Sequence, residues 1–364
     1  MLIKRKGVNE GIARDWLERF LRIIIFRYYQ QKPREEGIEE LIDIFLDEIE
    51  RGITKCRITA WLHGIYLEVD KVELDEGVIL RAPIKDDLEV EIPLYPPVEE
   101  RPQPIYPPHA ILEIERKIEP NRVLAIISPY ECALQLYKCC PAYSYYVRIE
   151  PQGVVYAYIG GHYKSLQSIR DLTFRCSLTS DDVPKIRNFI NKILPKLPLN
   201  EWGRPLLNNY LGIAFARYQD ALLKTEPLSN KLAYAVFGLE ALYLGRDEFG
   251  ELRHRLAQRV AKVMHLLGKE QDPMRAYESV KKAYNIRSRF VHGGYEELKD
   301  IKLLIRIVEY LRLSILIFMF VDNKKSFLDL IDRSMLSEKA NEKLRGLLRK
   351  ILSSLYNSTP SEEN

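Results

Sequence analysis

From about residue 204 to residue 355, apolar residues recur at positions i, i+3, i+4 and i+7. This is the spacing of helices that bury one face, and prolines and glycines divide the stretch into segments of helix length. The pattern therefore predicts an α-helical bundle. We expect helices over roughly 204–224, 228–244, 250–268, 273–291 and 296–321, followed by two shorter ones that end near residue 355.

The first 200 residues follow a different pattern. Amphipathic helices are expected at about 11–31 and 35–52, and a plausible helix N-cap lies at Ser180–Asp182. Between them lie short runs rich in β-branched and aromatic residues, which predict a mostly antiparallel sheet. The expected strands are Arg57–Val69, Val78–Leu80, Leu88–Leu94, Ile111–Ile114, Val123–Ile127, Tyr145–Ile149, Val154–Ile159 and Leu172–Cys176.

The predicted fold class is therefore α+β, with N-terminal helices and a sheet followed by an all-helical part. A chain of 364 residues is about twice the usual domain size. We place the boundary near residue 200, where Pro195, Pro198 and Trp202 mark a hinge. Residues 1–200 would form a sensor or recruitment region of unknown family, and 201–364 the helical domain. The proline-rich stretch 93–108 is expected to run extended, as a stiff loop or as a docking peptide for SH3-type or WW-type domains.

Composition limits the function classes. The 55 basic and 51 acidic residues give a net charge of only +4, which excludes a general nucleic-acid-binding coat. The stretch from Arg246 to His292 is locally basic, with eleven Lys or Arg against six Asp or Glu. It is either a local anion-binding surface or a set of solvated helix faces. The most apolar stretch, Leu303–Val321, is interrupted by charged residues at helical spacing, so we expect a core helix and no membrane span.

The five cysteines form an odd set without a Cys-x-x-Cys pair, and no signal peptide precedes them. This pattern predicts reduced thiols in a cytoplasmic protein. A zinc site built from cysteines is an alternative that lacks the usual ligand spacing, and buried structural thiols are the simpler interpretation. We expect neither a metal nor a cofactor. The four cysteines of the zinc alternative are Cys132, Cys139, Cys140 and Cys176.

The candidate chemistry lies at the end of the helix expected at 273–291. Arg287 and His292 stand five residues apart, and Gly293–Gly294 follows directly with the freedom to end a helix. Arginine is a permanent cation that fits phosphate oxygens, and histidine both accepts and donates protons near neutral pH. Five residues turn a helix through about 500°, so the two side chains point about 140° apart. Two chains meeting across a two-fold axis would bring both groups into one cleft.

These residues resemble the HEPN domains, specifically the Apea-like branch. The matching features are Tyr284-x-x-Arg287-Ser288 and His292-Gly293, with a Leu-Glu-Ala-Leu helix at Phe237–Leu244 and an Arg-Leu-Ala-x-Arg helix at Arg255–Ala261. The resemblance covers about residues 204–320. It implies a four-helix-type bundle that dimerises through the motif helices. Many such proteins are metal-independent endoribonucleases of toxin–antitoxin, phage-defence or RNA-processing systems, and others bind nucleotides or act as scaffolds without catalysis.

The resemblance implies a cytoplasmic homodimer that cleaves single-stranded RNA and leaves a 2′,3′-cyclic phosphate. His292 would transfer protons and Arg287 would stabilise the charge on phosphorus. The alternatives are a helix-end histidine that bonds a carbonyl, and an arginine that forms an ion pair across the dimer. Glu240 lies among apolar residues and needs a partner, for which Arg287 is a natural choice. An antitoxin-like protein is a further expected partner. Residues expected to support the site or bind substrate are Tyr284, Asn285, Ser288 and Arg289.

The remaining histidines are interpreted as structural. Arg259 and His265 repeat the loose arginine-to-histidine spacing, but they lie inside one continuous helical segment. His63, His109 and His162 lie in the sheet region without partners at metal-ligand spacing, so solvated or packed histidines are expected there.

Overall fold

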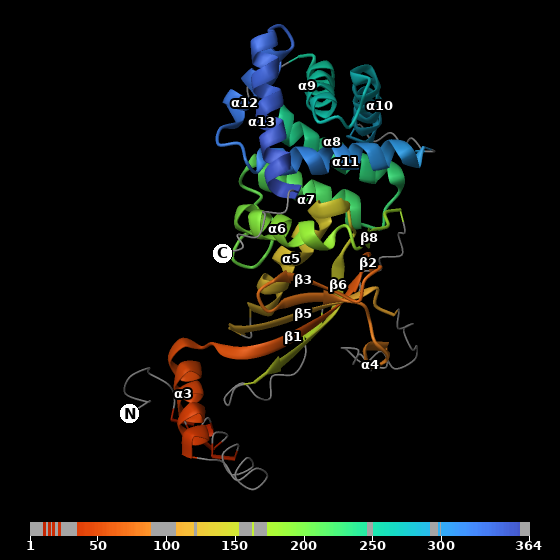
Figure 1. Cartoon of the computed structure of the whole chain (residues 1–364). Helices are drawn as coiled ribbons and strands as arrows, with labels where there is room; N and C mark the ends of the chain where they lie inside the picture. Colours follow the sequence, from red (N-terminus) through yellow and green to blue (C-terminus); the bar gives the residue numbers. More distant parts are fainter. Residues whose placement is uncertain are drawn as a thin grey trace.

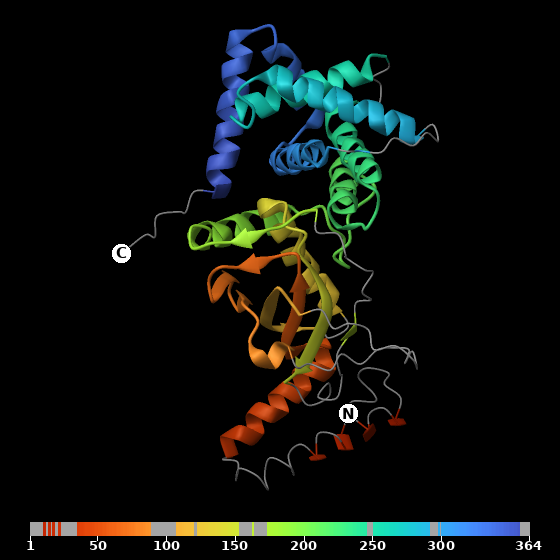
Figure 2. The same ribbon diagram turned by 90° about the vertical axis from the view of Figure 1, so that its right-hand side faces the viewer.

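The chain is an α+β protein in which a sheet and a helical bundle are stacked end to end, with helices between them (Figures 1 and 2). The structure is a computed structural model. It describes residues 35–88, 107–119, 122–152, 162–163, 173–245, 250–291, 298 and 300–356, together with short helical pieces between 10 and 22. These pieces are all that is described of the helix expected at 11–31, whereas the strand at Val154–Ile159 and most of the proline-rich stretch lie outside the described residues.

Strand β1 (Thr54–His63) is at the centre of the sheet. It pairs antiparallel with β5 (Ala110–Ile118) on one side and with β6 (Tyr143–Pro151) on the other. Among the described residues the strand order is β3-β4-β5-β1-β6-β7, and every neighbouring pair is antiparallel, as predicted. A separate pair, β2 with β8, is parallel. The bounds of the shorter strands are Tyr66–Leu67 (β2), Lys71–Asp75 (β3), Val78–Arg81 (β4), His162–Tyr163 (β7) and Ser177–Leu178 (β8).

Four strand predictions are corrected. Val123–Ile127 is the first part of helix α5 (Val123–Lys138), because its apolar run continues at helical spacing through the buried residues Tyr130, Leu134 and Tyr137. The run predicted at Arg57–Val69 is broken at Gly64, whose φ of 81° turns the chain between β1 and β2. The other two corrections are small: Leu88 ends the short helix α4 (Lys85–Leu88), and the described part of Leu172–Cys176 precedes β8.

The helices predicted over 35–52 and between 204 and 321 are confirmed, with shorter ends, whereas the last of the two short helices expected before residue 355 is a long one of 19 residues. Helix α7 begins at Tyr210 because the Asn209 side chain accepts a hydrogen bond from the Gly212 amide at 2.8 Å. Helix α11 begins at Ile301, where Asp300 caps the Lys302 amide at 3.0 Å. The helical bounds are Glu35–Arg51 (α3), Val183–Ile193 (α6), Tyr210–Leu223 (α7), Leu228–Tyr243 (α8), Leu252–Leu266 (α9), Pro273–Val291 (α10), Ile301–Phe318 (α11), Lys324–Ser334 (α12) and Glu338–Tyr356 (α13), with a 3-10 turn at Leu194–Lys196.

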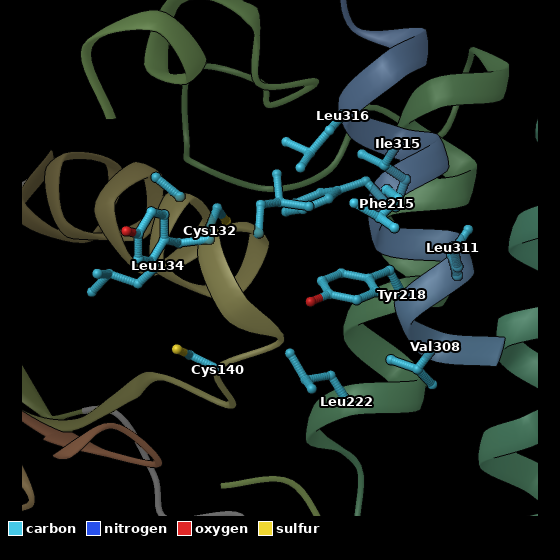
Figure 3. Packing of buried hydrophobic residues seen from close by; sticks show 14 of the residues in the cluster. Cys132, Leu134, Cys140, Phe215, Tyr218, Leu222, Val308, Leu311, Ile315 and Leu316 are labelled. Atoms are coloured by element: carbon cyan, nitrogen blue, oxygen red, sulfur yellow. The ribbon is translucent and has the colours of Figure 1, made fainter. Parts of the chain in front are cut away.

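One continuous cluster of buried residues joins the sheet, α5 and the bundle. Figure 3 shows part of this cluster, with Cys132 and Leu134 of α5 on one side and Phe215 and Tyr218 of α7 and Leu316 of α11 on the other. Arg312 of α11 adds a polar contact: its Nη1 donates to the carbonyl oxygen of Leu136 at 2.6 Å. The two predicted domains therefore share their core across residue 200. No helix among the described residues is long and apolar enough to cross a membrane.

The cysteine prediction is partly wrong. Cys140, just after α5, forms a disulfide with Cys176, just before β8. Cys56 and Cys132 are buried thiols outside the disulfide, as expected for structural cysteines, and Cys139 is a half-buried one. The disulfide removes two of the four thiolates of the zinc alternative. Within the described residues, no group of three or more His, Cys, Asp or Glu side chains is placed to hold a metal ion.

Candidate functional site

Helix α10 carries most of the predicted site. Its buried residues Ala276, Val280 and Ala283 face the bundle at helical spacing, so the following turns are held against α8 and α9. This packing directs Arg287 toward α8. Ser288 is half-buried, and Arg289 is exposed at the end of the helix.

Arg287 and Glu240 form an ion pair between α10 and α8. The Arg287 Nη2 donates to the Glu240 Oε2 at 2.7 Å, and the two side chains are only 22% and 14% exposed. The predicted pairing of Glu240 with Arg287 is thus confirmed. The pair lies within one chain, unlike the ion pair across a dimer that was the alternative for Arg287.

Two aromatic rings also hold the guanidinium. Its central carbon lies 4.5 Å from the ring centroid of Phe237 and 5.5 Å from that of Tyr284. These are distances at which a cation is attracted to an aromatic face. The Arg287 Nε is buried and donates to no acceptor among the described residues. The side chain is thus fixed in place, with one donor group still unused in the described part of the chain.

The electrostatics of the pair follow from its partial burial. Burial raises the pKa of the Glu240 carboxyl, and the opposing effect of Arg287 does not fully cancel it. Burial also raises the pKa of Tyr284, helped by Glu240 and opposed by Arg287 and Arg253. Tyr284 therefore lies within the electrostatic influence of two arginines and one carboxylate.

Arg253 of α9 is a member of this cluster that the sequence analysis missed. Its Nη1 donates to the Oδ1 of Asn285 at 2.9 Å, and both residues are exposed. No local pattern predicts this contact, because it depends on how α9 and α10 are rotated against each other. The nearest signal was the excess of basic residues between Arg246 and His292.

The structure brings together Glu240, Tyr284, Asn285 and Arg287, with Arg253 beside them. His292 and the glycines after it lie outside the described residues, so the pairing of Arg287 with His292 remains a prediction. The arrangement offers one fixed and one exposed guanidinium near the end of α10, which suits the binding of a phosphate.

The second arginine–histidine pair, Arg259 and His265, has structural contacts, as predicted. Arg259 is 3% exposed, binds both carboxylate oxygens of Asp332 and donates to the Tyr243 carbonyl at 2.6 Å. It thereby ties α9 to α12 and to the end of α8. The Nδ1 of His265 lies 3.2 Å from the carbonyl oxygen of Glu270.

Two of the sheet histidines are packed, as expected. His109 Nδ1 accepts a hydrogen bond from the Gly64 amide at 3.0 Å, and the His63 ring lies 4.7 Å from the His109 ring. Burial lowers the pKa of His63 to about 4, and His109 adds to the effect. His162 lies in β7, and its side chain is outside the described part.

Comparison with known proteins identifies no relative: the chain matches no protein-family model, no curated protein and no solved structure.

Proposed function

We propose that the chain is a metal-independent endoribonuclease that acts as a homodimer on single-stranded RNA, in defence, in a toxin–antitoxin pair or in RNA processing. The observation that carries the proposal is the fixed position of Arg287, held by Glu240, Phe237 and Tyr284 five residues before His292. A cation held in place before substrate binds stabilises developing negative charge without reorganising during the reaction.

In the proposed reaction, the RNA 2′-hydroxyl attacks the neighbouring phosphorus and the bond to the 5′-oxygen breaks. One His292 accepts the proton of the 2′-hydroxyl, and the second His292 of the dimer gives a proton to the leaving 5′-oxygen. Arg287 stabilises the charge on the phosphorane oxygens. The products are a 2′,3′-cyclic phosphate and a free 5′-hydroxyl.

The dimer is supported by the apolar end of α10. Phe290 and Val291 are 36% and 50% exposed there, although both are apolar. A second copy packed on this end would cover them and bring two copies of the motif together. An antitoxin-like protein that covers the same end would block the site.

A cytoplasmic location also belongs to the proposal. The Cys140–Cys176 disulfide counts against this location, because disulfides are rare in reducing compartments.

The test is cleavage of single-stranded RNA in EDTA. The wild type should cut, and mass spectrometry of the fragments should find cyclic phosphate ends. His292→Ala should lose the activity, whereas Arg349→Ala, which removes an exposed arginine of α13, should retain it. Cutting that requires a metal, or that persists in His292→Ala, would refute the mechanism.

The second candidate function is a non-catalytic module that binds RNA or a nucleotide. The observation that favours it is the Glu240 carboxylate, which already neutralises the charge of Arg287. This candidate predicts saturable binding without turnover and weaker binding by Arg287→Ala. The products of the EDTA assay separate the two candidates, since only a nuclease produces cyclic phosphate ends.

A further inference from the structure

The two arginines of the α9–α10 cluster differ in how much of their charge a ligand can reach. Arg287 is 22% exposed and its charge is matched by Glu240. Arg253 is exposed, and its Nη1 donates to the side chain of Asn285, a neutral amide. The four charged and polar groups Arg253, Asn285, Arg287 and Glu240 therefore carry a net charge of about +1, and that charge is on Arg253.

The contact with Asn285 also restricts the direction of the guanidinium. An arginine has five N–H donors in a planar fork, and Asn285 uses one of them on Nη1. The planar group is thereby oriented, and within the described part of the chain most of its donors stay available. Phosphate oxygens are the acceptors that such a fork fits best.

Tyr284 links the two arginines. The charges of both Arg253 and Arg287 act on its hydroxyl, and the Arg287 guanidinium lies 5.5 Å from the centroid of its ring. Arg253 and Arg287 thus lie on the same part of the surface, on neighbouring helices. A chain with regularly spaced phosphates could contact both at once.

We propose that Arg253 binds an RNA backbone phosphate that neighbours the one held at Arg287, and that Asn285 positions Arg253 for this contact. The inference rests on the proposed function, since it assigns a second phosphate subsite to the same RNA. It changes the role expected for Asn285 from substrate contact to positioning residue. A backbone contact carries no base preference, so the subsite should serve any sequence.

The test measures binding of fluorescein-labelled poly(U) and poly(A) oligonucleotides to the full chain by fluorescence anisotropy, with His292→Ala as background to prevent cleavage. Arg253→Ala should weaken binding of both RNAs about tenfold and reduce the slope of log Kd against log salt concentration by about one. Arg253→Lys keeps the charge but loses the planar fork, so its affinity should lie between those of the parent and Arg253→Ala. The matched control Arg349→Ala should change neither quantity.

A double-mutant cycle tests the role of Asn285. Asn285→Ala should weaken binding about threefold alone and should have no further effect in Arg253→Ala, because the residue acts through the arginine. Single-turnover cleavage, measured with His292 intact over a range of RNA concentrations, should reach half its maximal rate in Arg253→Ala at an RNA concentration about tenfold higher than in the parent. A merely structural role would lower the thermal midpoint together with the affinity.

Three outcomes are decisive. If Arg253→Ala and Arg349→Ala bind alike with the same salt slope, the subsite is refuted while the nuclease proposal stands. If the wild type binds RNA but does not cut it in EDTA, the nuclease proposal fails, and the loss of affinity in Arg253→Ala still supports the subsite. If the parent protein binds neither RNA, both proposals are overturned.

Discussion

The guanidinium of Arg287 and the carboxylate of Glu240 meet at 2.7 Å between two helices, and less than a quarter of either side chain is exposed. Neither helix needs this pair in order to form, since both bury apolar faces of their own. The pair therefore fixes one cation on a surface that would otherwise hold a flexible side chain. Burying the two charges costs desolvation free energy, and their mutual attraction offsets this cost only while both side chains are present.

Removing one partner of this pair should destabilise the fold. Glu240→Ala leaves the Arg287 guanidinium half-buried without its carboxylate, and we expect a loss of about 2 kcal/mol in the free energy of unfolding. The matched control is Glu278→Ala on α10, whose exposed pair with Lys281 should contribute less than about 0.5 kcal/mol. Urea unfolding followed by circular dichroism measures both.

The double variant Glu240→Met with Arg287→Met is the critical comparison for that pair. Because it removes both charges together, it should be more stable than Glu240→Met alone, with a coupling of at least about 1 kcal/mol. Additive losses in this cycle would mean that the two side chains do not interact in solution.

The raised pKa of Glu240 predicts a pH dependence. The folded protein binds the proton of this carboxyl more tightly than the unfolded chain does, because burial disfavours its charged form. Its contribution to stability is therefore fully present below the unfolded pKa, whose ordinary value is 4.5, and is lost as the pH rises through the folded pKa. The free energy of unfolding of the wild type, relative to Glu240→Gln, should fall as pH increases through that window. Parallel curves for the two proteins would contradict this assignment.

Most of the bundle could be predicted from the sequence, since apolar spacing reports directly which face of each helix is buried. The pairing of Glu240 was predictable for a related reason: an acidic residue among apolar neighbours needs a cation nearby. The ends of the helices were predicted less accurately. The starts of α7 and α11, for example, are set by single capping side chains, Asn209 and Asp300. The β-branched start of α5 was mistaken for a strand at Val123–Ile127, because a run of five apolar residues is too short to distinguish the helical period from that of a strand.

Contacts between distant segments were the least predictable. Arg253 and Asn285 meet only because of the rotation of α9 against α10. Cys140 and Cys176 are 36 residues apart and meet only because the fold brings the chain just after α5 beside the chain just before β8. Nothing in their local sequence distinguishes them from the three free cysteines.

Arg312 should be important for joining the sheet half to the bundle. It is 5% exposed, donates to the carbonyl oxygens of Leu136 and Tyr137 at the end of α5, and forms an ion pair with Glu309. Arg312→Ala would leave these acceptors unsatisfied, so we expect a loss of about 3 kcal/mol or more in the free energy of unfolding. The exposed Arg349→Ala should change it by less than about 0.5 kcal/mol. If Arg312→Ala loses no more free energy of unfolding than the control, the fold does not depend on the hydrogen bonds between Arg312 and the end of α5.

The Cys140–Cys176 disulfide should stabilise the fold by restricting the conformations of the unfolded chain. It closes a loop of 36 residues, for which about 2–4 kcal/mol is typical. The thermal midpoint of the wild type should therefore fall when dithiothreitol is added. The variant with Cys140→Ser and Cys176→Ser should melt near the reduced wild type with or without the reductant. Labelling of thiols in the unfolded, unreduced protein gives an independent check, since three of the five cysteines should react. Reaction of all five, together with a midpoint insensitive to reductant, would mean that the bond does not form in solution.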